Sequence, residues 1–353
     1  MKQFNPHRYL KKVFSLQWFS RLIRLQFSLL LFIWVYPCNL YSLELTPFHT
    51  QNQSPLIQIY GLPSTGEANV TPLGSKDFKL VVDLSNNYID DSAGGDRIVL
   101  DGESYRWTFV GRYGIAKGVE FGVEIPYIVQ GGGFLDGFIE SYHNTFGFSQ
   151  GGRDQAPSGR LLYQYQRNGI NKINVDTSSS GLGDLRLTTA FQLYQKENEN
   201  PTAATLRTSL KLPTGNSDHL RGSGSTDLAV WLTASSGHKF ESGLWTSFGS
   251  IGTMGMSDGK VLQEQQRNLV GYGSIGVGWC PFSWIGFKIQ INGHTPFYRD
   301  SDLVELSAGS AQVTVGGSLA LSKTTSLDIG VSEDIIIKTA PDVVFHIAIQ
   351  SRY

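Results

Sequence analysis

From residue 78 onward, apolar and polar side chains alternate over segments much longer than an ordinary strand. In one such segment Tyr105, Trp107 and Phe109 alternate with Arg106 and Thr108. A period of two places one set of side chains on each face of a strand. The segments run about 9–13 residues, whereas soluble strands average about 5–6 and a tilted membrane strand needs about 9–11. The alternation therefore favours membrane-spanning strands over a soluble β-sandwich.

The pattern predicts an all-β chain that forms a transmembrane antiparallel β-barrel of about twelve strands. The strands are expected at 78–86, 104–114, 118–128, 184–194, 203–212, 226–236, 240–252, 267–280, 284–294, 310–321, 325–335 and 342–353. A hairpin at 160–175 outside the barrel is the alternative that would change this count by two. An even count places both termini on the periplasmic side.

The expected connections alternate in length. Short turns are expected at 115–118, 236–239, 280–283 and 322–325, and long links near 129–183, 213–225, 253–266 and 295–309. Short periplasmic turns and long extracellular loops are typical of outer-membrane barrels.

Residues 1–42 are predicted to be a signal peptide. They carry six Lys and Arg residues and no acid, and a short apolar run at 27–36 follows the basic region. A membrane helix needs roughly 20 apolar residues, which makes this run short for a span and typical of a secretory leader. An uncleaved inner-membrane anchor is the alternative.

Removal of the leader changes the charge and the cysteine count. It would leave 23 basic residues against 30 acidic ones, with Cys280 as the one remaining cysteine. An acidic chain is a poor partner for nucleic acid, and a lone cysteine forms no internal disulfide. We expect residues 77–353 to form the barrel, preceded by a segment at 43–76 that lies in the periplasm or threads the lumen.

The last segment, 342–353, carries a further barrel signal. Phe345, Ile347, Ile349 and Tyr353 are expected to face lipid. A terminal aromatic residue on such a strand resembles the signal that the barrel-assembly machinery reads. That machinery and outer-membrane lipid are therefore the expected partners.

Charged residues recur at positions that alternation assigns to the barrel interior. A charge that faces lipid at the midplane costs roughly 2–4 kcal/mol, so these residues need water or one another. Two interpretations stay open: a salt-bridged lumen that is closed, and a polar conduit. The lumen-facing candidates are Arg106, Arg112, Glu120, Glu124, Asp184, Arg186, Arg207, Lys211, Asp227 and Lys288.

A glycine-rich link after the third expected strand could restrict the barrel mouth. Three consecutive glycines permit a sharp turn. Within 134–146, apolar residues recur at intervals of three and four, as on one face of a short helix. Deleting 131–146 is expected to raise single-channel conductance in a folded barrel. A solvated loop helix is the alternative. The gate candidates are Gly131, Gly132, Gly133, Phe134, Leu135, Phe138 and His143.

Several short pieces of the sequence resemble a known family. They are Leu100-Asp-Gly-Glu103, Arg112-Tyr-Gly-Ile115, Val123-Glu-Ile-Pro-Tyr127, Gly132-Gly-Phe-Leu-Asp-Gly-Phe-Ile139, Ser180-Gly-Leu-Gly-Asp184 and Leu210-Lys-Leu-Pro-Thr-Gly215. Over about 57–353 the chain resembles the uncharacterised bacterial family called domain of unknown function 3187. The Gly-Leu-Gly-Asp and Leu-Pro-Thr-Gly pieces also resemble outer-membrane barrels of the phenol meta-pathway group. That second resemblance implies a channel for hydrophobic compounds, and the family implies no catalytic residues.

Together these features predict a passive channel or transporter in the outer membrane of a Gram-negative bacterium. Its expected solutes are small, and hydrophobic compounds are among them. Two alternatives belong to other classes: a structural or adhesion barrel without transport, and an outer-membrane lipid hydrolase. The hydrolase needs a serine and a histidine together on the rim. His143 and His294 are the loop or strand-end candidates for that histidine, but no serine nucleophile motif accompanies either. No cofactor, metal site or catalytic residue is predicted.

Overall fold

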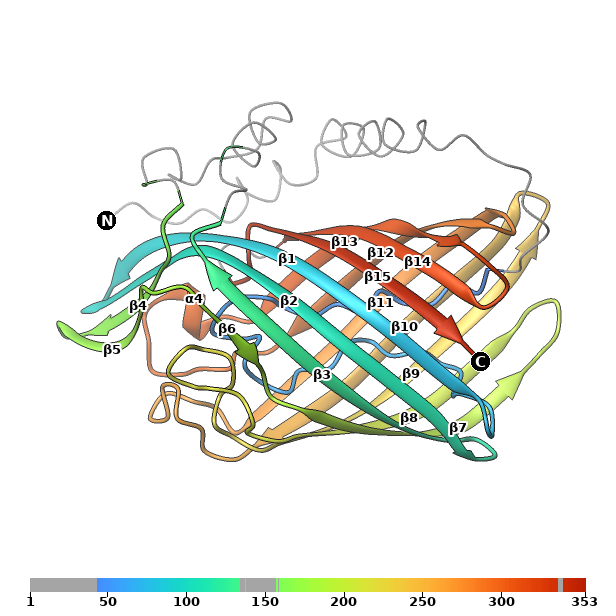
Figure 1. The fold of residues 1–353 in the computed structure, drawn as a ribbon, viewed down its shortest axis with the longest axis horizontal. Helices are drawn as coiled ribbons and strands as arrows, with labels where there is room; N and C mark the ends of the chain where they lie inside the picture. Colours follow the sequence, from blue (N-terminus) through green and yellow to red (C-terminus); the bar gives the residue numbers. More distant parts are fainter. Residues whose placement is uncertain (1–42, 134–136, 138–156, 158, 336–338) are drawn as a thin grey trace.

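A closed antiparallel β-barrel of twelve strands makes up most of the computed structural model (Figure 1). The structure describes residues 43–133, 137, 157, 159–335 and 339–353. The predicted fold class is therefore confirmed. The barrel strands are β1 (Lys76–Ala93), β2 (Asp96–Ala116), β3 (Val119–Gly131), β7 (Arg186–Lys196), β8 (Thr202–Lys211), β9 (Asp227–Phe240), β10 (Gly243–Met256), β11 (Leu269–Phe282), β12 (Ile285–His294), β13 (Ser310–Ala320), β14 (Thr325–Asp334) and β15 (Val343–Arg352).

The first and last strands close the barrel. β1 pairs with β15 from Asp77↔Arg352 to Asn86↔Val343, and each of the other barrel strands pairs with its neighbours in chain order. Closure leaves no unpaired strand edge in the wall. That is what a β-structure needs in lipid, where no water is present to satisfy exposed backbone groups.

Burial alternates along the strands as the sequence pattern predicts. In β2, Trp107 and Phe109 are 41% and 57% exposed on the outside, while Arg106 and Thr108 are buried inside. The outer face is thus apolar and the inner face polar, the reverse of a soluble barrel. This arrangement matches a wall that contacts lipid outside and polar groups inside.

The two ends of the barrel differ in their connections. The short turns 117–118, 197–201, 241–242, 283–284 and 321–324 lie at one end, and the longer loops 212–226, 257–268 and 295–309 lie at the other. The backbones of Lys76 and Tyr353 exchange two hydrogen bonds at the short-turn end, at 2.7 and 2.8 Å. The turn expected at 236–239 lies instead at 241–242, because β9 continues to Phe240.

The hairpin of β1 and β2 is longer than the sequence predicts. Strands expected at 78–86 and 104–114 continue toward each other and meet at Gly94 and Gly95, which both have positive φ. Glycine adopts such angles without a steric penalty, which allows a two-residue turn. The expectation was wrong here because much of the added length, such as 98–104, is buried on both faces and does not alternate in polarity.

Three short strands and one helical turn complete the described structure. β4 (Leu162–Arg167) and β5 (Ile170–Val175) form the hairpin outside the barrel that the sequence left open, and β4 pairs with the extended part of β2. β6 (Ser179–Leu182) pairs with the end of β3, and α4 (Val304–Ser307) lies between β12 and β13. Among the described residues, no helix has the length and apolar character needed to cross a membrane.

We predict that β15 controls assembly of the barrel. Ile347 is 44% exposed on the outer face and pairs with Val82 and Ile329. Ile347→Asp should lower the folded yield, because a charge at mid-membrane costs up to a few kcal/mol of a marginal stability. Deleting Tyr353 should act in the same direction, since it removes the backbone pair with Lys76.

Heat-modifiable mobility in gels measures this yield. Lys323→Asp, at an exposed position on the short turn between β13 and β14, is the control and should fold normally. Normal mobility of both β15 variants would contradict the prediction.

Candidate functional site: the barrel lumen

Residues 43–71, called here the lumen segment, run inside the barrel without forming a strand (Figure 1). The segment starts at the short-turn end, where the Leu43 amide donates to the carbonyl of Ser283. It then approaches the long loops, where the Tyr298 hydroxyl donates to the carbonyl of Leu56 at 2.8 Å. It returns to the short-turn end at Thr71. The segment therefore makes a complete excursion through the lumen.

The composition of the lumen segment explains its irregular backbone. Pro47, Pro55 and Pro63 lack an amide donor, and Gly61 and Gly66 add freedom, so a continuous strand is disfavoured. Buried backbone groups still need partners. Side chains of the wall supply them, so the segment is anchored by wall residues in place of a strand ladder.

These anchoring bonds use both backbone amides and backbone carbonyls of the lumen segment. The amide of Phe48 donates to Gln290 Oε1 at 2.8 Å, and the amide of Gly61 donates to Asp227 Oδ2 at 2.7 Å. Three wall arginines donate to carbonyls of the segment: Arg106 to Gln58 at 3.1 Å, Arg186 to Leu62 at 3.2 Å, and Arg207 to Glu67 at 2.9 Å.

The ten polar candidates predicted from alternation are all buried. They lie on β2, β3, β7, β8, β9 and β12, with Asp184 just before β7. The structure brings them into separate clusters, most of which also include the lumen segment. The residues are Arg106, Arg112, Glu120, Glu124, Asp184, Arg186, Arg207, Lys211, Asp227 and Lys288.

One cluster surrounds Lys211 near the start of the long loops. Its ammonium lies 2.5 Å from Asp184 and 3.4 Å from Asp227, and it also donates to Ser223. Asp184 in turn accepts from the amide of Gly215 at 2.7 Å. The Gly-Leu-Gly-Asp and Leu-Pro-Thr-Gly pieces of the sequence therefore meet at this carboxylate.

A second cluster centres on Lys288 of β12. Its ammonium lies 2.9 Å from Asp328 Oδ2, donates to the carbonyl of Thr46 at 3.0 Å, and lies 4.0 Å from the centroid of the Phe48 ring. One buried cation thus binds the wall and the lumen segment together.

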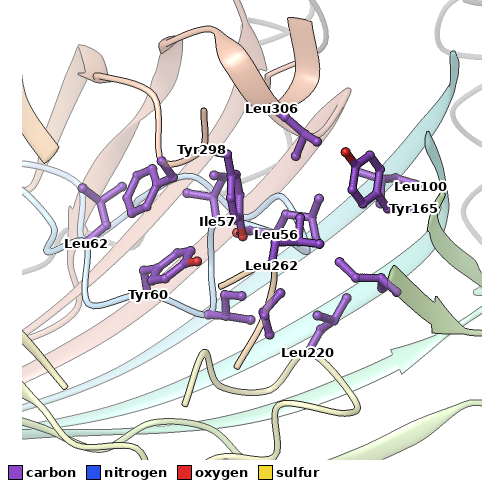
Figure 2. Close-up of a cluster of buried hydrophobic side chains, with 14 of the residues drawn as sticks. Leu56, Ile57, Tyr60, Leu62, Leu100, Tyr165, Leu220, Leu262, Tyr298 and Leu306 are labelled. Atoms are coloured by element: carbon purple, nitrogen blue, oxygen red, sulfur yellow. The ribbon is translucent and has the colours of Figure 1, made fainter. Parts of the chain in front are cut away.

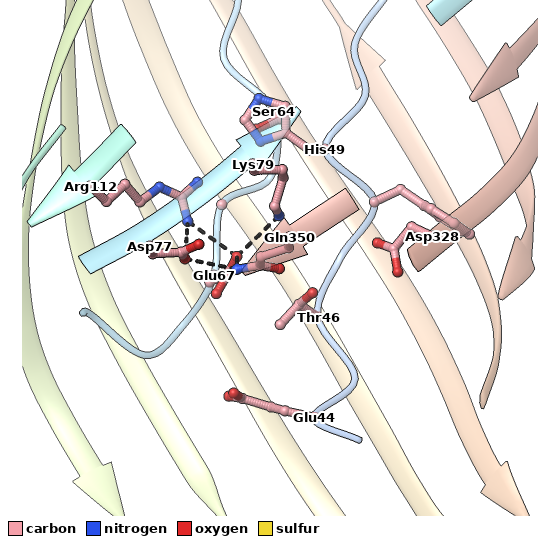
Figure 3. Close-up of polar contacts among 12 residues, drawn as sticks. Glu44, Thr46, His49, Ser64, Glu67, Asp77, Lys79, Arg112, Asp328 and Gln350 are labelled. Carbon is pink, nitrogen blue, oxygen red and sulfur yellow. Dashed lines mark hydrogen bonds and ion pairs between the residues drawn. The ribbon is translucent and has the colours of Figure 1, made fainter. Parts of the chain in front are cut away.

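The third cluster centres on Glu67, a residue of the lumen segment that the sequence pattern did not single out (Figure 3). Its Oε1 accepts from Lys79 at 3.1 Å, from Arg112 at 3.1 Å and from Gln350 at 3.0 Å. Its Oε2 accepts from Arg352 at 2.7 Å. All four donors belong to the wall, and we call this group the Glu67 site.

Two further ion pairs lie next to these clusters. Arg207 Nη1 lies 3.0 Å from Glu120 Oε1, and that carboxylate also accepts from the Thr71 amide. Arg186 Nη1 lies 3.4 Å from Glu124 Oε2. Both carboxylates come from β3, so this strand faces the lumen with acids where β7 and β8 present cations.

An apolar cluster covers the lumen segment at the long-loop end (Figure 2). Tyr60 stacks on Phe297 with 4.9 Å between the ring centroids. The cluster joins the turn of the segment to the loops and to the extension of β2 and β4. Its labelled members are Leu56, Ile57, Tyr60, Leu62, Leu100, Tyr165, Leu220, Leu262, Tyr298 and Leu306.

The gate predicted after β3 is described only at its start. Gly131 ends β3, Gly132 follows, and Gly133 has a φ of +78°. The other gate candidates, Phe134, Leu135, Phe138 and His143, lie outside the described residues. The gate therefore stays a prediction.

His294, the other histidine considered for an enzyme, lies at the end of β12. Its Nε2 is 3.0 Å from the side-chain amide nitrogen of Asn52 in the lumen segment. In the part of the chain that the structure describes, no group of His, Cys, Asp and Glu side chains is placed to hold a metal ion.

We predict that Lys211 is required for the stability of the folded barrel. Lys211→Met would leave Asp184 and Asp227 as buried carboxylates without their shared cation, a change that typically costs about 3–5 kcal/mol. Chemical unfolding in detergent should show the loss. Lys239→Met, at an exposed position near the end of β9, is the control. An equal stability of the two variants would contradict the role given to Lys211.

Known structures with a similar fold are outer-membrane barrels. The COG4313 outer membrane channel from Pseudomonas putida F1 matches with a TM-score of 0.50 at 12% identity, over 82% of this chain and 98% of that one. The NanC porin matches with a TM-score of 0.42 at 7% identity, over 78% of this chain and 98% of the porin. At 12% identity the likeness to the COG4313 channel describes the fold alone.

No curated protein matches the sequence. The sequence model of a family described as "Protein of unknown function (DUF3187)" matches residues 25–353, as the short pieces of sequence predict. The match spans nearly the whole chain, and the chain therefore belongs to the DUF3187 family.

Proposed function

We propose that this protein is a passive outer-membrane channel for small solutes, and that the lumen segment closes it. The apolar outside and polar inside of a closed barrel support a place in the outer membrane. Export would use the leader at 1–42, and insertion would use β15 and the barrel-assembly machinery. The short turns would then face the periplasm.

The manner in which the lumen is filled carries this proposal. Barrels of eight strands are filled by their own side chains, and larger barrels leave internal space. Here that space holds a separate length of chain, anchored by wall side chains such as Gln290 and Arg106. Water can replace such bonds one by one, so the segment can leave without unpairing the barrel strands.

The kind of contact that anchors the lumen segment differs along its length. Its ends are tied by ion pairs and hydrogen bonds at the short-turn end, including the bond from the Thr71 amide to Glu120 at 2.8 Å. Its turn is covered by apolar contacts of Leu56 and Tyr60 at the long loops. A solute that arrives from the loop side would meet this apolar cover first, which suits a solute with an apolar part.

A structural barrel without transport is the alternative that one observation favours. The apolar cluster and the ion pairs close the lumen from both ends, as a rigid scaffold would require. The two functions differ in whether the lumen segment moves, and a cross-link can test this directly.

Thr65 of the lumen segment and Ser274 of β11 supply a site for that cross-link. The Thr65 hydroxyl donates to Ser274 Oγ at 2.8 Å, so cysteines at both positions would place their sulfur atoms within reach of a disulfide. In a Cys280→Ser background, the oxidised pair should abolish conductance in planar bilayers. Reduction with dithiothreitol should restore it, because the segment is again free to leave.

Ser274→Cys alone is the matched control and should conduct equally under both conditions. A second variant that lacks residues 45–70 should conduct continuously if it folds. Conductance that is unchanged by the cross-link would contradict gating by the lumen segment. Absence of conductance from the folded deletion variant would favour the structural barrel.

A further inference from the structure

The Glu67 site is built by the wall, but the group at its centre comes from the lumen segment (Figure 3). Lys79 is on β1, Arg112 is on β2, and Gln350 and Arg352 are on β15. All four donate to one carboxylate, at distances of 2.7–3.1 Å. The donors belong to paired strands and so would keep their places if the segment moved.

The charges at this site balance only while the lumen segment is present. The ion pairs join four wall cations to two wall carboxylates and to Glu44 and Glu67 of the segment. Withdrawal of the segment would therefore leave an excess of two positive charges on the wall. The cations are Lys79, Arg112, Arg207 and Arg352, and the wall carboxylates are Asp77 and Glu120.

We propose that the Glu67 site binds the carboxylate group of an anionic solute, and that Glu67 occupies it in the closed channel. This inference rests on the proposed channel function and adds a solute class to it. Buried cations that lose their partner are costly, so the wall favours replacement of Glu67 by another carboxylate over an empty site.

The geometry of the site fits a carboxylate better than a spherical anion. Lys79 and Arg112 contact one carboxylate oxygen of Glu67, and Arg352 contacts the other. Donors spread over two oxygens match the two acceptor atoms of a carboxylate, and such charge-assisted hydrogen bonds are strong. Chloride presents one centre and would leave donors unpaired.

Occupation of the site by Glu67 and by a solute is mutually exclusive, because both use the same donors. A bound carboxylate would weaken the hold on the lumen segment at its short-turn end. Binding and opening would thus be linked, with each favouring the other. A solute that combines a carboxylate with an apolar part suits both the Glu67 site and the apolar cover at Leu56 and Tyr60.

Chemical rescue tests this inference. Glu67→Ala removes the carboxylate that the four wall donors share and takes from Lys79 its ion-pair partner, so the variant should melt several degrees below the unaltered protein in detergent. Acetate should raise its melting temperature in a saturable manner. Acetamide at the same concentration, and chloride at matched ionic strength, should not.

Asp90→Ala is the control, because Asp90 forms an exposed ion pair with Arg97 at 3.4 Å. Acetate should not raise the melting temperature of this variant in a saturable way. An equal effect of acetate on both variants would overturn the inference. So would a folded Glu67→Ala protein that acetate leaves unchanged.

If Glu67→Ala does not fold in a buffer with chloride as the anion, the yield of refolded protein replaces the melting temperature as the measurement. Acetate should raise the yield and acetamide should not. A yield that acetate leaves unchanged, or that acetamide raises equally, would overturn the inference. The melting readout does not depend on conductance. Rescue by acetate without channel activity would support the binding site and contradict the proposed channel. Channel activity without rescue would support the channel and contradict the binding site.

Discussion

Charged groups inside a membrane barrel must find partners, and this requirement shapes the whole lumen. Each strand turns apolar residues toward lipid, and its remaining positions carry charges that cannot face lipid without a cost of roughly 2–4 kcal/mol. Wall pairs such as Lys211 with Asp184 satisfy part of this need. The lumen segment satisfies much of the rest, because its carbonyls accept from arginines and Glu67 accepts from the cations at the short-turn end. The barrel wall and the lumen segment therefore supply ion-pair and hydrogen-bond partners for each other within one polar core.

Much of the fold follows from alternation alone. The period of two assigns Arg106 to the interior and Trp107 to the outside, and in the structure Arg106 is buried and Trp107 is exposed. Alternation fails where a strand is covered on both faces, as in the buried stretch at 98–104 of β2. Burial there comes from β4 and the long loops, which are distant in sequence. No local pattern reports that cover, so the extended hairpin of β1 and β2 could not be predicted.

The candidate site was predictable only on the side of the wall. Arg112 and its neighbours are strand residues, and their inward direction follows from the alternation. Glu67 lies in a segment with no period, and nothing local distinguishes it from Glu44 or any other acid. Its position depends on a chain path through the lumen that proline and glycine permit but do not direct. A weak signal existed: the segment is short of basic residues, whereas the wall carries many cations.

The central claim is that residues 43–71 occupy the lumen of the folded barrel. The most direct measurement is labelling of a cysteine at Ser64, a buried position, in a Cys280→Ser background, with a bulky hydrophilic maleimide on intact outer membranes. Lys323→Cys, at an exposed position on the turn between β13 and β14, reports full accessibility after the membranes are opened. The account predicts that the cysteine at position 64 reacts far more slowly than the one at position 323, and reacts fully only when the barrel is denatured. Rapid labelling at position 64 in the folded barrel would contradict it.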